Sequence, residues 1–138
     1  MPISFVIPGK PEPQGRPRAT KRGKRIMMYD PKPSRDYKAY VSMIARQHAP
    51  NKPLEGALGV KLKIYRQIPK SATKKDRELY NAGIKRPIVK SDIDNYSKSI
   101  LDACNGIIYH DDSQIVGLWA EKYYSDEPRA EIEITEVF

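Results

Sequence analysis

Alternating hydrophobic and polar residues predict four β-strands in this chain. The alternation runs over residues 3–7, 58–64, 115–124 and 129–136. The last two stretches are separated only by residues 125–128, whose sequence Ser-Asp-Glu-Pro is typical of a turn. We therefore expect these two strands to pair as an antiparallel hairpin.

Three amphipathic helices are predicted between the first and third strands. Ser34 is expected to cap the first helix, because apolar side chains recur after it at helical spacing until shortly before Pro50. Ser71 is expected to cap a short, highly charged second helix, and a third runs to about Cys104. Strands and helices in this order predict an α+β fold, with a small, mixed but mostly antiparallel four-stranded sheet and helices packed on one face.

Residues 8–33 are predicted to form a basic, proline-rich loop. Five prolines lie between Lys10 and Pro33, and so many prolines exclude a helix or a central strand. The length of 138 residues suits a single domain covering residues 1–138. No apolar run approaches the ~20 residues of a membrane span, and the first residues do not resemble a secretory signal, so we expect a cytoplasmic protein.

The charge along the chain is polarised. The net charge is +8, and residues 1–50 alone hold eleven basic and three acidic side chains. Residues 91–138, in contrast, hold three basic and eleven acidic side chains. A cationic surface of this kind is typical of proteins that bind nucleic acid. The single cysteine, Cys104, excludes a disulfide within the chain and a thiol-rich zinc site.

Carboxylates are concentrated in the acidic segment 92–112. Asp92 and Asp94 lie two residues apart at the start of the third helix, and Asp111 and Asp112 follow in a turn after its end. If the chain returns this turn to the start of the helix, the carboxylates meet, and a hard divalent cation such as Mg²⁺ relieves their repulsion. The alternative is structural, with Asp94 as a helix cap and Asp111–Asp112 as an ordinary turn.

Arg16 and Arg18, separated by one proline, are each able to bind a phosphate in a forked geometry. Acidic metal ligands inside a cationic surface are the combination that a metal-dependent nuclease needs. The residues expected to contact DNA are Lys10, Arg16, Arg18, Lys21, Arg22, Lys24, Arg25 and Lys90. The alternative for residues 21–25 is a disordered cationic arm.

Four motifs together make the chain resemble the RusA-type Holliday junction resolvases, in particular the branch found in Gram-positive bacteria and their phages. They are Pro8-Gly9-Lys10-Pro11 with Arg16-Pro17-Arg18, then Lys90-Ser91-Asp92-Ile93-Asp94-Asn95, then Leu101-Asp102-Ala103 with Asn105-Gly106, and Asp111-Asp112-Ser113-Gln114-Ile115. Tyr96 departs from the family pattern, in which an aliphatic residue usually follows Asp-Asn.

The resemblance implies a crossover junction endodeoxyribonuclease. It implies that Asp92, Asp94 and Asp112 bind the catalytic Mg²⁺, with Asp111 in support and Mn²⁺ as a possible substitute. It also implies that Lys98 acts near the scissile phosphate. The alternative for Lys98 is an ion pair with Asp102, four residues further along the chain. The expected enzyme is a homodimer that nicks two opposing strands of a four-way junction during recombination and repair, associated with the nucleoid when bound to DNA.

Two other functions fit the same sequence less closely. One is an endonuclease of broader branch or flap specificity, and the other is a non-catalytic, basic DNA-binding protein such as a phage accessory factor. The trio of Asp92, Asp94 and Asp112 distinguishes them, because a pure DNA-binding protein gains nothing from anions beside DNA. We expect His110 to be an ordinary surface residue, and Trp119 to lie in the core or at a dimer surface.

Overall fold

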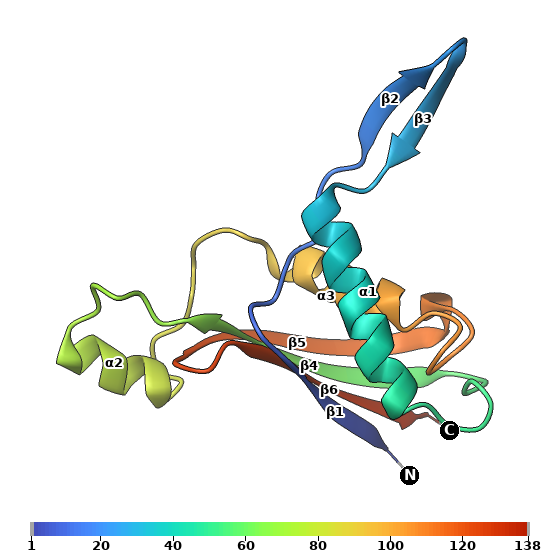
Figure 1. The fold of residues 1–138 in the computed structure, drawn as a ribbon. Coiled ribbons are helices and arrows are strands. Elements are labelled where there is room, and N and C mark those ends of the chain that lie inside the picture. Colours follow the sequence, from blue (N-terminus) through green and yellow to red (C-terminus); the bar gives the residue numbers. More distant parts are fainter. Residues whose placement is uncertain (1, 138) are drawn as a thin grey trace.

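The computed structural model describes residues 2–137, apart from the side chain of Arg22. Its centre is a four-stranded sheet with the order β1-β6-β4-β5 (Figure 1). The strands are β1 (Ile3–Pro8), β4 (Leu58–Gln67), β5 (Ile115–Ser125) and β6 (Arg129–Glu136). β6 pairs antiparallel with β1 and β4, while β5 pairs parallel with β4. The predicted mixed, mostly antiparallel sheet is therefore confirmed.

The expected hairpin between the last two strands is wrong, because β4 lies between β5 and β6. The link from Ser125 to Arg129 spans up to about 13 Å, more than two strand spacings of about 4.8 Å, so it is long enough to step across one strand. In the observed register Lys61 lies opposite Glu133 and Lys63 lies opposite Glu131. Opposite charges at paired positions stabilise this choice of neighbour.

Two helices cover one face of the sheet, as predicted (Figure 1). They are α1 (Lys32–Gln47) and α3 (Ile93–Ala103). The core between helices and sheet contains Phe5, Ile7, Tyr37, Val41, Ile44, Leu58, Val60, Leu62, Ile64, Tyr96, Ile100, Leu101, Ile132 and Ile134. Tyr96, which departs from the family pattern, is therefore a packing residue. The third helix, α2 (Lys74–Asn81), lies beside the sheet and buries none of its residues.

Two helices start differently from the prediction. Pro31 is the N-cap residue of α1, and Ser34 lies inside the helix, where its hydroxyl accepts a hydrogen bond from the N–H of Gly15 at 2.7 Å. In α2 the cap is Thr73 rather than Ser71, and its hydroxyl accepts from the N–H of Asp76 at 3.1 Å. Ser34 therefore does not cap α1; its hydroxyl holds the loop that contains Gly15 against this helix.

The basic N-terminal segment contains a two-stranded ribbon that the proline count did not predict. Its strands, β2 (Arg18–Arg22) and β3 (Arg25–Tyr29), form a sheet of their own that projects away from the body of the molecule (Figure 1). The ribbon lies between Pro17 and Pro31, so no proline interrupts it. Gly23, at a φ of 60°, opens the two-residue turn, a position that favours glycine in hairpins.

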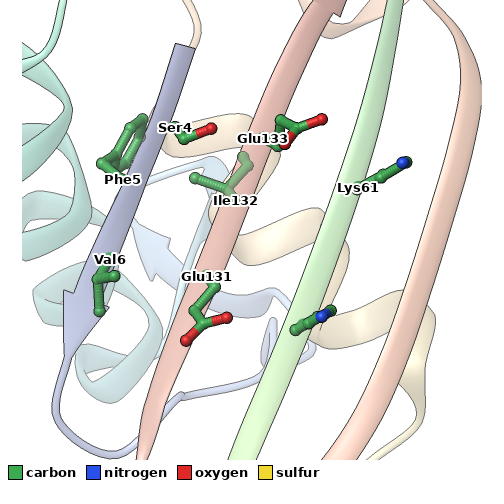
Figure 2. A pocket seen from close by; sticks show the side chains of 8 residues that line it. Ser4, Phe5, Val6, Lys61, Glu131, Ile132 and Glu133 are labelled. Atoms are coloured by element: carbon green, nitrogen blue, oxygen red, sulfur yellow. The ribbon is translucent and has the colours of Figure 1, made fainter. Parts of the chain in front are cut away.

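The other face of the sheet carries polar and isolated apolar side chains. Figure 2 shows a hollow on this face in which Ser4, Val6, Lys61, Glu131 and Glu133 are labelled. Trp119 of β5 is paired with Lys61, so it lies on the same face, and 65% of its surface is exposed. Neither α1 nor α3 covers this surface, which we call the open face. Across residues 2–137, no helix has the length and the apolar composition to cross a membrane.

Candidate active site

Helix α3 carries a row of charged residues. Asp94, Lys98 and Asp102 follow one another at intervals of four residues, so each is a neighbour of the next on the helix surface. Asp92 is the N-cap residue in an extended conformation, yet its side chain makes no capping hydrogen bond. Asp94 lies in the first turn, where a carboxylate is favoured by the helix dipole. Both carboxylates are exposed and open to a ligand.

Asp92 and Asp94 line a hollow between the start of α3 and the edge strand β5. The other lining residues are Arg86, Pro87, Ile93, Trp119, Ala120, Glu121 and Lys122. Lys122 donates hydrogen bonds to the carbonyls of Val89 and Ser91, at 3.3 and 3.1 Å, and so holds the chain before α3 against β5. The start of the helix is thereby fixed to the sheet.

The turn that holds Asp111 and Asp112 is organised by Gln114. Asp112–Gln114 form a single 3₁₀ turn, η1, and the carboxylate of Asp111 caps it by accepting from the N–H of Ser113 at 3.0 Å. These bonds lower the pKa of Asp111. The side chain of Gln114 accepts from the N–H groups of His110 and Asp111, at 2.8 and 3.0 Å. Its amide nitrogen donates to the carbonyls of Leu54 and Gly56, at 2.9 and 3.1 Å.

Asp112 lies beside Asp102, in the last turn of α3. Partial burial raises the pKa of Asp112, and a hydrogen bond with the Asp102 carboxyl group raises it further. Asp102 lies in turn between two lysines, with Lys38 of α1 at 3.4 Å and Lys98 at 4.0 Å. The ammonium group of Lys38 also contacts Asp30 at 3.0 Å.

The four predicted aspartates form two pairs in one chain rather than one group. Asp111 and Asp112 lie near the end of α3, not near its start as expected. The Cα atoms of Asp94 and Asp102 are about 12 Å apart along the axis, at 1.5 Å per residue. Within residues 2–137 no group of three or more His, Cys, Asp or Glu side chains is arranged to hold a metal ion. Lys98 lies between the two pairs, and its side chain is 62% exposed.

The predicted DNA-binding side chains are at the surface wherever the structure describes them. Lys10, Arg16, Arg18, Lys21, Lys24, Arg25 and Lys90 are exposed, while the side chain of Arg22 lies outside the description. His110 is an exposed residue 3.6 Å from Glu55, in agreement with a surface role. Most of the basic residues belong to the ribbon or to its root.

The root of the ribbon is attached directly to α3. The N–H of Gln14 donates to the carbonyl of Asn95 at 2.9 Å, and its side-chain amide donates to Asp30 at 3.2 Å. A Cβ atom on Gly15 would lie 2.9 Å from Pro31 and from Ser34, so only glycine permits this approach. The cationic ribbon therefore starts next to the carboxylates of α3.

Sequence reasoning did not assign a role to Gln14, Lys38 or Gln114, and it treated Asp102 only as a partner for Lys98. The family motifs contain Gln114 and Asp102, and that was the available signal. Lys38 approaches Asp102 only because α1 and α3 pack together, which no local pattern indicates.

Comparison with known proteins agrees with this geometry. The family model described as Endodeoxyribonuclease RusA matches residues 8–135. The chain is 44% identical over 137 residues to the uncharacterized protein YqaN of Bacillus subtilis (strain 168), covering 98% of this chain and 96% of that protein. The extent of these matches places the chain in the RusA endodeoxyribonuclease family.

Proposed function

We propose that this protein is a Mg²⁺-dependent endonuclease that resolves Holliday junctions in the cytoplasm by paired nicks in opposing strands, during recombination and repair. The observation that carries the proposal is the hydrogen bond between Gln14 and Asn95, which joins the cationic ribbon to α3. We call the exposed surface of α3 that carries Asp94, Lys98 and Asp102 its acidic face. DNA held along the ribbon by its phosphates thus approaches carboxylates that would otherwise repel it.

The donor set fits a hard divalent cation, because it consists of carboxylate oxygens without sulfur or imidazole. We assign Asp92, Asp94 and Asp112 as the residues that hold Mg²⁺, with Asp111 in support and Mn²⁺ as a substitute. Asp112 lies at the other end of α3 from Asp92 and Asp94, so the turn 110–114 would have to approach the start of the helix for one ion to bind all three. Partial burial is the main cause of the raised pKa of Asp112, and the neighbouring carboxyl group of Asp102 raises it further; a cation would relieve this second contribution. When bound, the metal supplies Lewis acidity toward the phosphodiester and toward water.

The protein's own cations have separate tasks. We assign Lys98, an exposed cation between the two carboxylate pairs, to the stabilisation of charge on the phosphate undergoing hydrolysis. Lys38 neutralises Asp102 and Asp30 and holds them in place. The expected products are a 5′-phosphate and a 3′-hydroxyl.

A cleavage assay on synthetic DNA tests the proposal. The protein is incubated with a four-way junction, a flap and a linear duplex, each in Mg²⁺, in Mn²⁺ and in EDTA. We expect symmetric nicks in the junction with either metal, no cleavage in EDTA, and little cleavage of the duplex. Equal cleavage of the flap indicates the broader branched-DNA nuclease, and binding without cleavage in either metal indicates the non-catalytic DNA-binding protein.

We also propose that the active unit is a homodimer joined through the open face. A junction requires two symmetric cuts, and a two-fold dimer supplies two copies of the site. Trp119 projects beside a hollow whose floor contains the paired residues Gly59 and Gly117. A second copy turned by 180° presents its own Trp119 to this hollow, and the rows of lysine and glutamate on β4 and β6 offer complementary charges.

A further inference from the structure

The β2–β3 ribbon exposes large apolar side chains that no other part of residues 2–137 buries. The exposed fractions are 72% for Ile26, 48% for Met27, 64% for Met28 and 41% for Tyr29. The ribbon stands clear of the sheet and the helices (Figure 1). An isolated two-stranded ribbon is marginally stable in water, so exposed apolar residues on it indicate a surface for a partner.

The register of the ribbon gathers its most exposed apolar residues on one side. Met28 lies opposite Ala19, and Ile26 lies opposite Lys21. Paired residues and residues two positions apart share a face, so these four side chains form one face, which we call the apolar face. Thr20, Met27 and Tyr29 belong to the other face, where they line a hollow together with Arg35 of α1 and with part of Met28.

The charge of the ribbon specifies the chemistry of the partner. No acidic residue occurs between Arg16 and Tyr29. In the part of the chain that the structure describes, Arg18, Lys21, Lys24 and Arg25 take part in no ion pair. A partner must therefore offer anions at the edges and an apolar surface between them. Stacked base pairs flanked by phosphates have this arrangement.

An anionic lipid surface also combines negative charge with apolar groups. The way the ribbon is attached to the rest of the molecule nevertheless favours nucleic acid as its partner. The root is fixed to α3 through Gln14 and to α1 through Ser34, which accepts from Gly15. Each strand has five residues, so the ribbon extends about 17 Å from this root, or about five base steps of 3.4 Å. Whatever the ribbon contacts is therefore close to the acidic face of α3.

We propose that Ile26 and Met28 form a wedge that enters branched DNA between base pairs at the branch point. The inference rests on the proposed function and adds to it a way in which the protein distinguishes branched DNA from continuous duplex. Apolar side chains that enter a continuous duplex must break base stacking, whereas stacking is already interrupted at a branch. The wedge therefore contributes selectivity for branched DNA, while the cations of the ribbon contribute affinity for all DNA.

The decisive variant replaces both wedge residues by threonine, as Ile26→Thr with Met28→Thr. Threonine keeps the strand propensity of the ribbon while removing most of the apolar surface. Met43→Thr is the matched control, because Met43 lies on α1 with an exposed fraction of 51% and belongs to neither the wedge nor the acidic face. Lys21→Ala with Arg25→Ala is the contrasting variant, which removes charge and leaves Ile26 and Met28 in place.

Binding is measured with 2-aminopurine placed either at the branch point or in an arm of a four-way junction, in Ca²⁺ to prevent cleavage. We expect the parent and the control to raise the fluorescence of the branch-point probe only. The threonine variant should lose this increase and its preference for junction over duplex should fall roughly tenfold, with an unchanged salt dependence. The charge variant should lose affinity for junction and duplex alike and keep the fluorescence increase at saturation.

Two failures are distinguishable. If the parent binds and nicks junctions but the threonine variant shows the parent's fluorescence change and preference, the wedge is wrong and the proposed function stands. If the parent has no preference for junctions, both proposals fall. Binding of anionic vesicles that is lost in the threonine variant, with junction binding unaffected, identifies the apolar face as a lipid contact and overturns the wedge.

Discussion

At the scale of single residues, the acidic face of α3 is shaped by contacts between carboxyl groups and lysines. Asp102 contacts Lys38 at 3.4 Å and Lys98 at 4.0 Å, and its carboxyl group lies beside that of Asp112. Two carboxyl groups that share a hydrogen bond require a proton or a cation between them. The structure thus presents Asp112 in a setting that a bound cation stabilises.

Replacing Asp94 by Asn should abolish cleavage and leave junction binding unchanged or slightly stronger. The substitution keeps the side-chain size and is tolerated at the start of a helix, so the fold should persist. It removes one negative charge. In the proposed mechanism this charge helps to bind the metal, and it also repels DNA. Cleavage in Mg²⁺ and binding without metal are measured separately. Asp126→Asn, in the turn after β5, is the control, and cleavage by Asp94→Asn within a few-fold of the parent rules out the assignment.

Replacing Gln114 by Ala should reduce both stability and cleavage. The substitution removes four hydrogen bonds, two within the turn 110–114 and two that hold this turn to the carbonyls of Leu54 and Gly56. We expect a loss of about 1–3 kcal/mol in the free energy of unfolding, measured by urea denaturation. Gln114→Glu retains the two accepted bonds and should fall between Ala and the parent. Equal stability of all three proteins would mean that the turn is held by its backbone alone.

The ion pair at the root of the ribbon predicts a pH dependence. The hydrogen bond from Lys38 lowers the pKa of Asp30 from its ordinary value of 3.8. A lowered folded-state pKa stabilises the protein at neutral pH, and this stabilisation is lost as the pH falls through the folded-state value. Asp30→Asn should therefore be less stable by about 0.5–1 kcal/mol at pH 7 and equal to the parent near pH 2. A difference that is the same at both pH values contradicts the assignment.

At the scale of elements, the residues proposed to bind DNA and the carboxylates proposed for catalysis lie on different parts of the chain. Arg16 precedes β2 and Arg18 begins it, and both side chains are exposed beside the root. The carboxylates lie on a different element, α3, to which the root is attached by a backbone hydrogen bond. Changes in the ribbon should therefore alter DNA binding without altering the carboxylates that we propose as metal ligands.

Replacing Arg16 and Arg18 by Ala should weaken junction binding and flatten its salt dependence. Each phosphate contact contributes about 0.9 to the slope of log K against log salt on duplex DNA, so the double variant should lose about 1.8. Binding isotherms at a series of salt concentrations measure this slope. Lys52→Ala removes an exposed cation outside the ribbon and serves as the control. An unchanged slope in the double variant would show that the root does not contact the backbone of DNA.

The sequence predicts the positions of most strands and helices, but it does not predict which strands pair with one another. Alternation at Leu58, Val60, Leu62 and Ile64 correctly places β4, because a half-buried strand must alternate. The same pattern in β6 is equally compatible with β5 as a partner. The choice of β4 depends on cross-strand pairs such as Lys61 with Glu133, which exist only after the strands meet. The ribbon was not predicted, because the prolines on both sides of it indicated a loop and the turn signal at Gly23 was not used.

The candidate site shows the same division. Residue types and motifs predict the four aspartates and Lys98, and the Lys98–Asp102 pair is observed at 4.0 Å. The distribution of the aspartates over two ends of α3 was not predicted, because it depends on where η1 lies relative to the helix. The assignment of these residues to the metal remains a prediction, tested by the substitutions above.

At the scale of the whole molecule, the open face is a surface to which the single chain gives no function. Trp119 lines both the glycine hollow on this face and the hollow that contains Asp92 and Asp94. A dimer joined through Trp119 would therefore place a second copy next to the start of α3. Assembly and catalysis would then depend on one another.

Replacing Trp119 by Ala should convert a dimer into a monomer. Because 65% of Trp119 is exposed, its removal should change the stability of the single chain little. Light scattering should give twice the chain mass for the parent and one chain mass for the variant at the same concentration. Met43→Ala, which changes an exposed apolar residue of α1 outside the open face, is the control. A parent that is strictly monomeric, both free and bound to a junction, rules out the dimer.

The order of the strands also determines when the molecule can be completed during its synthesis. β1 pairs with β6 in the sheet, so residues 3–8 wait for residues 129–136. At 5–20 residues per second, this delay is about 6–25 s on the ribosome. The cationic ribbon emerges early in that interval, long before the sheet beneath α3 can close. A nascent chain can thus hold nucleic acid before it can cut it, and a stop codon anywhere before residue 129 leaves β1 without its partner.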